Sequence, residues 1–526
     1  MFPPSIDDYI DDNNSSRAID MYVDSLDTAK LKFANTRKSN KVEGQKAYSP
    51  KLMLKIYMYG YLNKIRSSRM LERECKRNVE LMWLTQNLTP SYHTIADFRK
   101  DNPKSLKRVF KEFVLLCKHI GLIGDGLKAV DGAFLRANAS KNQLIMKKTL
   151  TKDLKTIEEN IDNYLNNLDS VDKEKQPLDL ADKLPQDIEK LKAQREILLN
   201  DLKYLETIGK NQHNRTDKDA NLMIKPAHNL MAYNSQNVVD DKYKLIVATD
   251  ISTKGSDADQ IYKMAMQTKE NLELSKDDKL DIVGDTGYYS GKELLNCQDD
   301  NINAIVPEAD KNKAQRDKGK YTRDMFKYNQ EQDHYICPAN QRLTRKPTPQ
   351  VKNDKLNFTY TCSSTICKAC PLKEKCVPIE TKSKRIYRWE HEHIVEEHRI
   401  KMQTQEAKNI VRKRGSMVEH PFGTIKRMLG WDHFLVRGKE KVSGENALIM
   451  FAYNFKRVIN ILGTAMFKKL LIAIKDGNIE QIIKDIQAYR RKIRVFLANN
   501  FNTKFLCLYF VENRKYALQI RQYVKI

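Results

Sequence analysis

Residues 280–291, LDIVGDTGYYSG, combine a short apolar strand with an acidic turn. The strand leads to Asp285, and Gly284 and Gly287 flank that aspartate. In open α/β sheets, ligands collect at the ends of such strands. The stretch therefore predicts an α/β protein with an acidic site at a strand end.

Residues 127–137, LKAVDGAFLRA, place Asp131 in the same setting. Gly132 follows it directly, so the chain can bend or a ligand can approach the backbone there. Two carboxylates at adjacent strand ends repel each other unless divalent cations neutralise them. Mg²⁺ suits such a site because it binds one or two carboxylates and keeps places for water and phosphate oxygens. The simpler explanation for each aspartate is a turn former or helix cap, and Asp250, which also ends a strand, is a rival.

The segments around these two strands indicate the fold. Apolar strand patterns recur at 230–240, 243–251 and 303–307, and a helical pattern covers 258–274. The resulting order is strand, strand, strand, helix, strand, helix, strand, once an inserted helical segment is set aside. That order predicts an α/β catalytic core of the RNase H-like class.

Residues 412–437 carry the carboxylate of Glu419 within a strongly basic segment. Ser416 and Glu419 have the S-x-x-E spacing of a capping box, which would only begin a helix. The alternative is chemical: Glu419 is a third carboxylate that holds a metal ion while basic side chains hold a phosphodiester. Pro421 indicates that the helix either begins close to Ser416 or bends there, because proline disrupts a helix already under way.

The composition points to a polyanionic partner. Lys and Arg total 93 against 68 Asp and Glu, giving a net charge of +25 with a normal 40% hydrophobic content. Membrane surfaces are also polyanionic, but no apolar run approaches the roughly 18–20 residues of a spanning helix. The acidic N-terminus lacks the basic and apolar regions of a signal peptide. We therefore expect a soluble cytoplasmic protein without a membrane partner.

Residues 1–120 have helical spacing and end in a basic helical face. The basic residues of that face are Arg99, Lys100, Lys104, Lys107 and Arg108. Short helices followed by a basic one suit a helix-turn-helix-like DNA-binding domain. A helical bundle with a solvated basic face fits the same residues.

Two insertions interrupt the α/β pattern. Apolar residues in 150–208 recur at steps of three and four on both sides of a polar connection, which predicts an antiparallel helical hairpin. The predicted organisation has three parts: a helical N-terminal DNA-binding domain at 1–122, an RNase H-like α/β domain at 123–460, and a basic helical tail at 461–526. Within the α/β domain we expect a helical-hairpin insertion at 149–210 and a Cys-rich insertion at 308–385.

The Cys-rich insertion holds five of the nine cysteines. Cys367-x2-Cys370 is a common metal knuckle, and Cys337 with Cys376 can complete a tetrahedral zinc site that leaves Cys362 spare. An iron–sulfur cluster or reduced thiols are the alternatives. A metal site with four protein ligands would stabilise this insertion, which is too small and polar to fold stably without it.

Three histidines follow this insertion: His391, His393 and His398. Their spacing matches neither H-E-x-x-H nor H-x-x-E-H. We therefore expect them on the surface of a helix.

Taken in order, these segments resemble bacterial insertion-sequence DDE transposases with a helical N-terminal transposase domain. The resemblance covers most of the chain to residue 460 and runs through FPPSIDDYIDD, SPKLMLKIYMYGYLNKIRSSRMLERECKRN, PSYHTIADFR, VDGAFLRANASKN, YNSQNVVD, GDTGYYS, CPLKEKC and EHPFGTIKRMLGWDHFLVRG. It implies that Asp131, Asp285 and Glu419 form the DDE triad and hold Mg²⁺ or Mn²⁺. It also implies that the N-terminal helices bind the terminal inverted repeats of the element.

The family's wider signature around the glutamate, Tyr-x2-Arg-x3-Glu-x6-Lys, is only partly kept. Glu419 and Lys426 match it, whereas Arg412 and Gly415 occupy the tyrosine and arginine places and Arg414 stands one place earlier. The predicted DNA contacts are Arg99, Lys100, Lys104, Arg412, Arg414, Lys426 and Arg437.

The expected function is DNA transposition. The protein would cleave DNA at the element ends and join it to target DNA, as a homodimer on DNA associated with the nucleoid. The hairpin at 149–210 would contribute to pairing the two ends or act as an intramolecular strut. The competing functions are a repressor without catalytic activity and an RNase H-like nuclease that cuts without joining.

Overall fold

The computed structural model describes residues 5–34, 47–171, 184–224, 229–352, 354–378, 380–477 and 484, excluding the side chains of 164–171 and 184–187. The chain forms two compact units. Unit 1 contains residues 1–98, 116–123 and 454–526, and unit 2 contains residues 99–115 and 124–453. None of the described helices is both long and apolar enough to cross a membrane.

Unit 1 is helical, as predicted for the N-terminal region. Its helices include α1 (Ser15–Ser25), α3 (Pro50–Leu62), α4 (Ser68–Cys75), α5 (Val79–Thr85) and α18 (Thr464–Lys475). The Ser49 hydroxyl begins α3 by accepting a hydrogen bond from the Leu52 amide at 3.2 Å, with Pro50 in the first turn. Helix α3 is buried almost throughout and forms the centre of the unit.

The first part of the predicted C-terminal tail belongs to unit 1. Helix α18 packs against α1, and the Phe467 ring lies 5.6 Å from the Phe455 ring. Lys468 Nζ also lies 3.8 Å from Asp12 Oδ1. The rest of the predicted tail, apart from residue 484, lies outside the described residues.

Residues 99–115 belong to unit 2, which differs from the predicted domain boundary at 122. They lie in the end of α6 (Tyr92–Asp101) and in α7 (Pro103–His119). The Phe113 ring lies 5.0 Å from the ring of Phe451 in α17 (Lys439–Leu462). Phe113 and Phe451 are far apart in the sequence, so the local helical pattern could not predict their contact or the position of the boundary.

The main sheet of unit 2 contains the predicted strands. They are β1 (Lys128–Arg136), β4 (Asn221–Ile224), β5 (Asn229–Asp240), β6 (Ile246–Ser252), β7 (Leu280–Val283) and β8 (Ile302–Ile305). The order is β4-β5-β1-β7-β8, and β6 pairs with β5. Strand β1 is antiparallel to β5 and parallel to β7, and β7 is parallel to β8. The observed class is therefore mixed α/β, as predicted.

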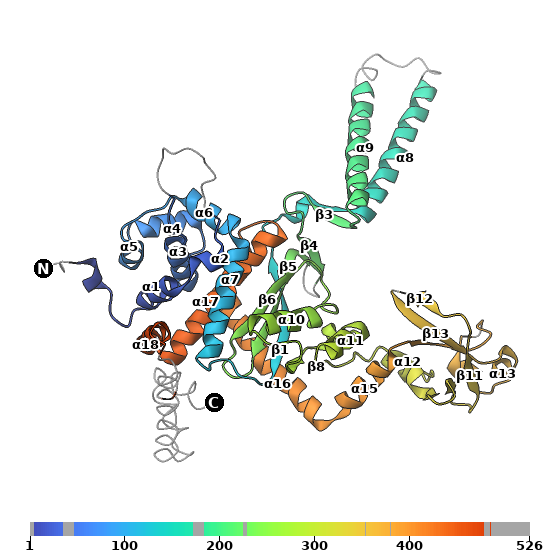
Figure 1. The fold of residues 1–526 in the computed structure, drawn as a ribbon. Helices are drawn as coiled ribbons and strands as arrows, with labels where there is room; N and C mark the ends of the chain where they lie inside the picture. The colour runs from blue at the N-terminus through green and yellow to red at the C-terminus, as the bar shows by residue number, and fades with distance from the viewer. Residues whose placement is uncertain are drawn as a thin grey trace, which may run out of the picture. The chain divides into compact units, whose positions relative to one another are not determined.

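Helices pack against this sheet (Figure 1). They are α10 (Ile261–Asn271), α11 (Gly291–Asp299), α15 (Glu392–Gln403) and α16 (Gln405–Gly423). Helix α10 contacts β5, β6, β7 and β8, and α16 contacts β1, β5, β7 and β8. The predicted hairpin is present as α8 (Lys147–Val171) and α9 (Leu184–Thr207), which lie side by side (Figure 1).

Helix α16 corrects the prediction of a capping box at Ser416. The helix begins at Thr404, whose hydroxyl accepts a hydrogen bond from the Ala407 amide at 3.2 Å. Ser416 lies inside the helix, where its hydroxyl donates to the Lys413 carbonyl at 2.8 Å. Pro421 also lies inside it, and the turn that follows, Thr424–Met428, is π-helical. The helix therefore accommodates the proline near its end instead of beginning anew.

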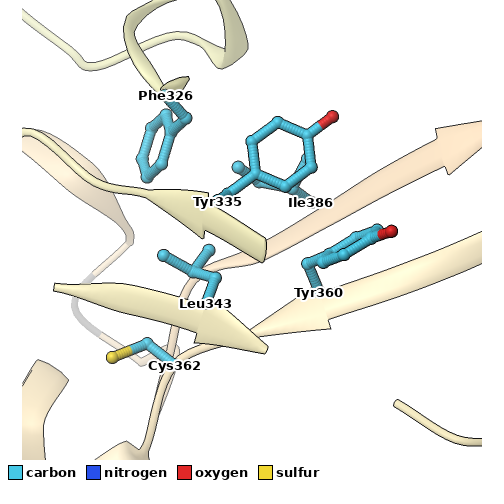
Figure 2. Packing of buried hydrophobic residues seen from close by; sticks show 6 residues of the cluster. All are labelled: Phe326, Tyr335, Leu343, Tyr360, Cys362 and Ile386. Atoms are coloured by element: carbon cyan, nitrogen blue, oxygen red, sulfur yellow. The ribbon is translucent and has the colours of Figure 1, made fainter. Parts of the chain in front are cut away.

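The Cys-rich segment has its own sheet, which the sequence did not predict. Its strands are β9 (Lys327–Asn329), β10 (His334–Ile336), β11 (Arg342–Arg345), β12 (Gln350–Lys352), β13 (Lys355–Thr361) and β14 (Arg385–Trp389). Figure 2 shows the core that these strands enclose, formed by Phe326, Tyr335, Leu343, Tyr360, Cys362 and Ile386. This segment therefore has a hydrophobic core of its own, which the prediction of a small and polar insertion did not include. Its apolar residues are few, but its aromatic rings bury large surfaces.

His398 corrects another prediction. It is only 6% exposed, and its Nε2 lies 2.8 Å from the Val306 carbonyl oxygen. It shares the buried face of α15 with Ile394 and Val395, one turn earlier. Of the other two histidines, His393 is exposed and His391 half-buried.

Candidate active site

Two of the three predicted carboxylates meet beside the end of β7: Asp285 follows that strand as predicted, whereas Asp131, predicted to follow its strand, lies within β1, which continues to Arg136 because it pairs with β5 along its whole length. The parallel register pairs Ala129 with Val283, so Asp131 and Asp285 follow at the same level of the sheet. Arg414 Nη2, from α16, lies 2.8 Å from Asp131 Oδ1 and 3.3 Å from Asp285 Oδ2. The two aspartates thus share one guanidinium group.

Arg414 is held in this position by further contacts. Its Nε donates to the Val130 carbonyl at 3.3 Å, and its side chain is only 14% exposed. Burial raises the pKa of Asp131, the Arg414 charge lowers it, and the charge of Asp285 raises it. Arg414 therefore relieves the repulsion between the aspartates, and a contact with a DNA phosphate would require it to leave them.

Glu419 lies on the same helix but is exposed to solvent. Its Oε1 lies 3.6 Å from the point where a Cβ on Gly415 would stand. No three of the described His, Cys, Asp or Glu side chains are arranged to hold a metal ion. Chemically, carboxylate oxygens are suitable ligands for a hard divalent cation. Asp131 and Asp285 are brought together by the contact that each makes with Arg414, whereas Glu419 completes no metal-binding group with them among the described residues.

A third aspartate, Asp257, lies beside this pair and was not predicted as a site residue. Asn234 Nδ2 and Gln236 Nε2, both from β5, donate to Asp257 Oδ1 at 2.7 and 2.5 Å. The Tyr288 hydroxyl donates to Gln236 Oε1 at 2.5 Å. Burial raises the pKa of Asp257, and the charge of Asp285 raises it further. The sequence signal was the polar run Asn234–Asn237 within β5, in which Asn234 and Gln236 point to the same face.

Asp250, the rival strand-end aspartate, has other partners. Lys107 Nζ lies 3.3 Å from its Oδ1, and Lys263 forms an ion pair with its Oδ2. Although burial raises the pKa of Asp250, the two lysines hold it below its usual value. Asp250 therefore serves a structural ion-pair network.

Arg99 corrects the set of predicted DNA contacts. Its side chain is 6% exposed and lies 3.6 Å from Glu445 Oε1, so this guanidinium is not presented to DNA. Lys100 and Lys104, in contrast, have 45% and 77% of their side chains exposed.

The other predicted DNA contacts lie around α16. Arg412 is exposed on that helix, and Lys426 follows in the π-helical turn. Arg437 is exposed and donates through Nε to the Asn138 carbonyl at 3.0 Å. Their contacts with DNA remain predictions.

The five clustered cysteines line a single cavity of about 30 Å³. Burial, and after it the neighbouring Cys367 thiol, raise the pKa of Cys362 to about 11. Cys362 therefore lies beside the other four thiols. Cysteine sulfurs are chemically suitable zinc ligands. In the described residues, however, they are not arranged around a common point.

Comparison with known proteins gives two family matches. A model for a transposase DDE domain matches residues 336–459, which include Glu419 but neither Asp131 nor Asp285. A model for a transposase domain (DUF772) matches residues 4–101. No curated protein matches the sequence.

Among solved structures, a piggyBac transposase synaptic complex with hairpin DNA is similar over 93% of this chain and 85% of that chain, with 8% sequence identity. Its TM-score of 0.29 is too low to establish a common fold. The matches to a transposase DDE domain at residues 336–459 and to a transposase domain at residues 4–101 support an insertion-sequence DDE transposase.

Proposed function

We propose that this DNA transposase binds the terminal inverted repeats of its element and carries out metal-dependent strand cleavage and strand transfer. The observation that carries the proposal is that Asp131, within β1, and Asp285, just after the parallel strand β7, lie at the same level and share the Arg414 guanidinium. The sheet supports an RNase H-like core for unit 2, because three antiparallel strands, β6, β5 and β1, continue into the parallel strands β7 and β8.

The proposed roles follow from the position of each side chain. Asp131 and Asp285 would hold a divalent cation, Mg²⁺ or Mn²⁺, with Glu419 as the third carboxylate once α16 presents it to them. Such a cation activates the attacking oxygen and stabilises the leaving oxygen in phosphoryl transfer. Arg414 would move from the aspartates to a DNA phosphate, where Arg412, Lys426 and Arg437 on the same segment would also bind.

The remaining parts of the chain fit this proposal. Lys100 and Lys104 are the exposed basic side chains of the N-terminal region that would contact the inverted repeats. The helical hairpin α8–α9 would pair two protomers into a homodimer on DNA. We retain the predicted boundaries of the hairpin and of the Cys-rich insertion, and we add α18 to the N-terminal helical domain.

The test is an in vitro reaction with a linear DNA that carries the element end. We expect strand breaks at the end of the inverted repeat and joined products with a target plasmid, both dependent on Mg²⁺ or Mn²⁺. Binding without strand breaks would indicate a repressor. Breaks without joined products would indicate a nuclease. A DNA of the same length with a scrambled repeat is the control for specific recognition.

The thiol cluster leads to a second prediction. We propose that Cys337, Cys367, Cys370 and Cys376 bind a structural zinc ion, because these thiols share one cavity. Protein purified without chelators should contain about one zinc per chain, since four thiolates complete a tetrahedral site. Plasma mass spectrometry would measure the zinc, and the double variant Cys367→Ser, Cys370→Ser should lose it.

The matched control for this measurement is Cys297→Ser. Cys297 is a buried thiol in α11, away from the cluster, and its replacement should leave the zinc content unchanged. Protein that holds no zinc, or that keeps its zinc in the double variant, would contradict the proposed site.

A further inference from the structure

The sheet of the Cys-rich segment, formed by strands β9 to β14, has one face that carries its core. The register pairs Tyr335 with Leu343 and Tyr360 with Ile386, and these four side chains form that core (Figure 2). Alternate residues of a strand point to opposite faces, so the residues between them lie on the other face of the sheet. We call this other face the outer face.

The outer face is strongly basic. The register pairs Lys327 with Ile336, and Ile336 with Arg342, so these residues share that face. Thr344, two residues after Arg342, is in register with Arg385 across β13. The basic residues that the register places on the outer face are Lys327, Arg342, Lys346, Lys352, Lys355 and Arg385. All of them are exposed except Lys355, which is half-buried.

Carboxylates are absent from this surface as far as the strands are concerned. None of the residues that the structure describes in strands β9 to β14 is an Asp or a Glu. The positive charges of the outer face are therefore not interrupted by negative charges from the sheet itself.

The two faces differ in how their basic side chains are neutralised. On the core face, Arg345 Nη1 lies 3.1 Å from Asp333 Oδ2, and Arg388 Nη2 lies 2.9 Å from Glu396 Oε2. On the outer face, the exposed basic side chains form no ion pair with any described residue. Like charges gathered on one exposed face create a positive potential, which attracts a polyanion.

The polyanion that fits this face is the phosphate backbone of DNA, the polyanion on which a transposase acts. The side chains available on the face are those that contact phosphates: Lys and Arg, together with the hydroxyl of Tyr387, which is 49% exposed. The face is formed by strands and presents no helix that could enter the major groove. Phosphate contacts position a protein on DNA but carry no sequence information. The face therefore suits DNA of any sequence.

We propose that the outer face of this sheet binds the backbone of DNA outside the inverted repeat, without sequence preference. This inference goes beyond the proposed function, which assigns DNA contacts to the N-terminal region and to the segment around α16. It does not depend on the catalytic carboxylates, so it can fail or succeed independently of them.

The experiment measures binding of the full-length protein to a duplex DNA that lacks the inverted repeat, by fluorescence anisotropy at several salt concentrations. The test variant is Arg342→Gln, Lys346→Gln, Arg385→Gln. Each lost phosphate contact reduces the slope of log affinity against log salt concentration by about one. The slope of the triple variant should therefore be less steep by about three, with weaker binding at each salt concentration.

The control variant is Lys311→Gln, Lys313→Gln, Lys318→Gln. It removes the same charge from exposed lysines in and beside α12 (Lys313–Asp317), outside the strands of the sheet. Its slope should equal that of the unaltered protein. An equal reduction of the slope in both variants would show an effect of net charge alone and would overturn the inference.

An unchanged slope in the test variant would also overturn the inference, whatever the cleavage reaction at the element end shows. A loss of binding confined to an RNA duplex of the same sequence would indicate RNA as the partner and would overturn it as well. Thermal unfolding shows whether the test variant is folded. Should it unfold, the single variant Arg385→Gln decides: its slope should be less steep by about one, and an unchanged slope contradicts the inference.

Discussion

Asp285→Ala is expected to abolish DNA cleavage while leaving DNA binding intact. Its carboxylate lies opposite Asp131 at the end of β7, where the two would hold the cation. A cation contributes several kcal/mol to transition-state stabilisation. Since each 1.36 kcal/mol corresponds to a factor of ten, the cleavage rate should fall by about a thousandfold or more. Gel analysis of the element-end substrate gives the rate, and fluorescence anisotropy of the same DNA gives the affinity.

Asp250→Asn is the matched control for this experiment. Asp250 also lies on a strand of the main sheet, but Lys107 and Lys263 neutralise it, and it has no place beside Asp131. The variant should cleave at close to the normal rate. If Asp285→Ala cut normally, or if Asp250→Asn lost cleavage instead, the assignment of the aspartates would be wrong.

Glu445→Ala is expected to cause a large loss of stability. The Glu445 side chain is fully buried, and its Oε2 accepts hydrogen bonds from the Leu435 and Val436 amides at 2.8 and 3.1 Å. Its Oε1 lies 3.6 Å from the buried Arg99 guanidinium. Removing one partner of a buried ion pair leaves an uncompensated charge and costs about 3–5 kcal/mol. Urea unfolding of the full-length protein, monitored by tryptophan fluorescence, would measure the change in the free energy of unfolding.

Glu440→Ala is the control on the same helix. Glu440 pairs with Lys104 at 3.6 Å, but both side chains are more than half exposed. A surface ion pair of this kind contributes about 0–1 kcal/mol, so this variant should unfold at nearly the normal urea concentration. Equal effects of the two substitutions would contradict the proposed structural role of the Arg99–Glu445 pair. The Leu435–Arg437 segment, which Glu445 holds by its amides, carries one of the predicted DNA contacts.

Local patterns in the sequence determined the elements of the fold. Apolar runs of strand length predicted the strands that carry Asp131 and Asp285, and steps of three and four residues predicted the hairpin α8–α9. These predictions succeed because burial selects apolar side chains at the period of each element. The spacing of strands and helices was also enough to predict a mixed α/β class. The short strands around Tyr335 and Tyr360 were missed, because each contributes only a few buried residues to its sheet.

The same local reasoning failed wherever a side chain's partner is distant in sequence. Arg99 looked like part of a solvated basic face until α17 supplied the buried Glu445. Ser416 and Glu419 had the spacing of a helix start, but α16 begins at Thr404, a full three turns earlier. His398 resembled its exposed neighbours, although the Val306 carbonyl is its partner. For Arg99 and His398, a long-range contact, which no short window contains, overrode the local preference.

The sequence by itself thus determined that the chain carries aspartates next to apolar strand residues, an excess of basic residues and a cluster of cysteines. Only the tertiary structure decided which of these groups meet. The parallel pairing of β1 with β7 aligns Asp131 with Asp285, and α16 inserts Arg414 between them. The two amides of β5 hold Asp257 beside Gly132 and Gly287. The physical reason is that a site depends on distances between side chains, and those distances are set by how strands and helices pack, not by the order of residues along the chain.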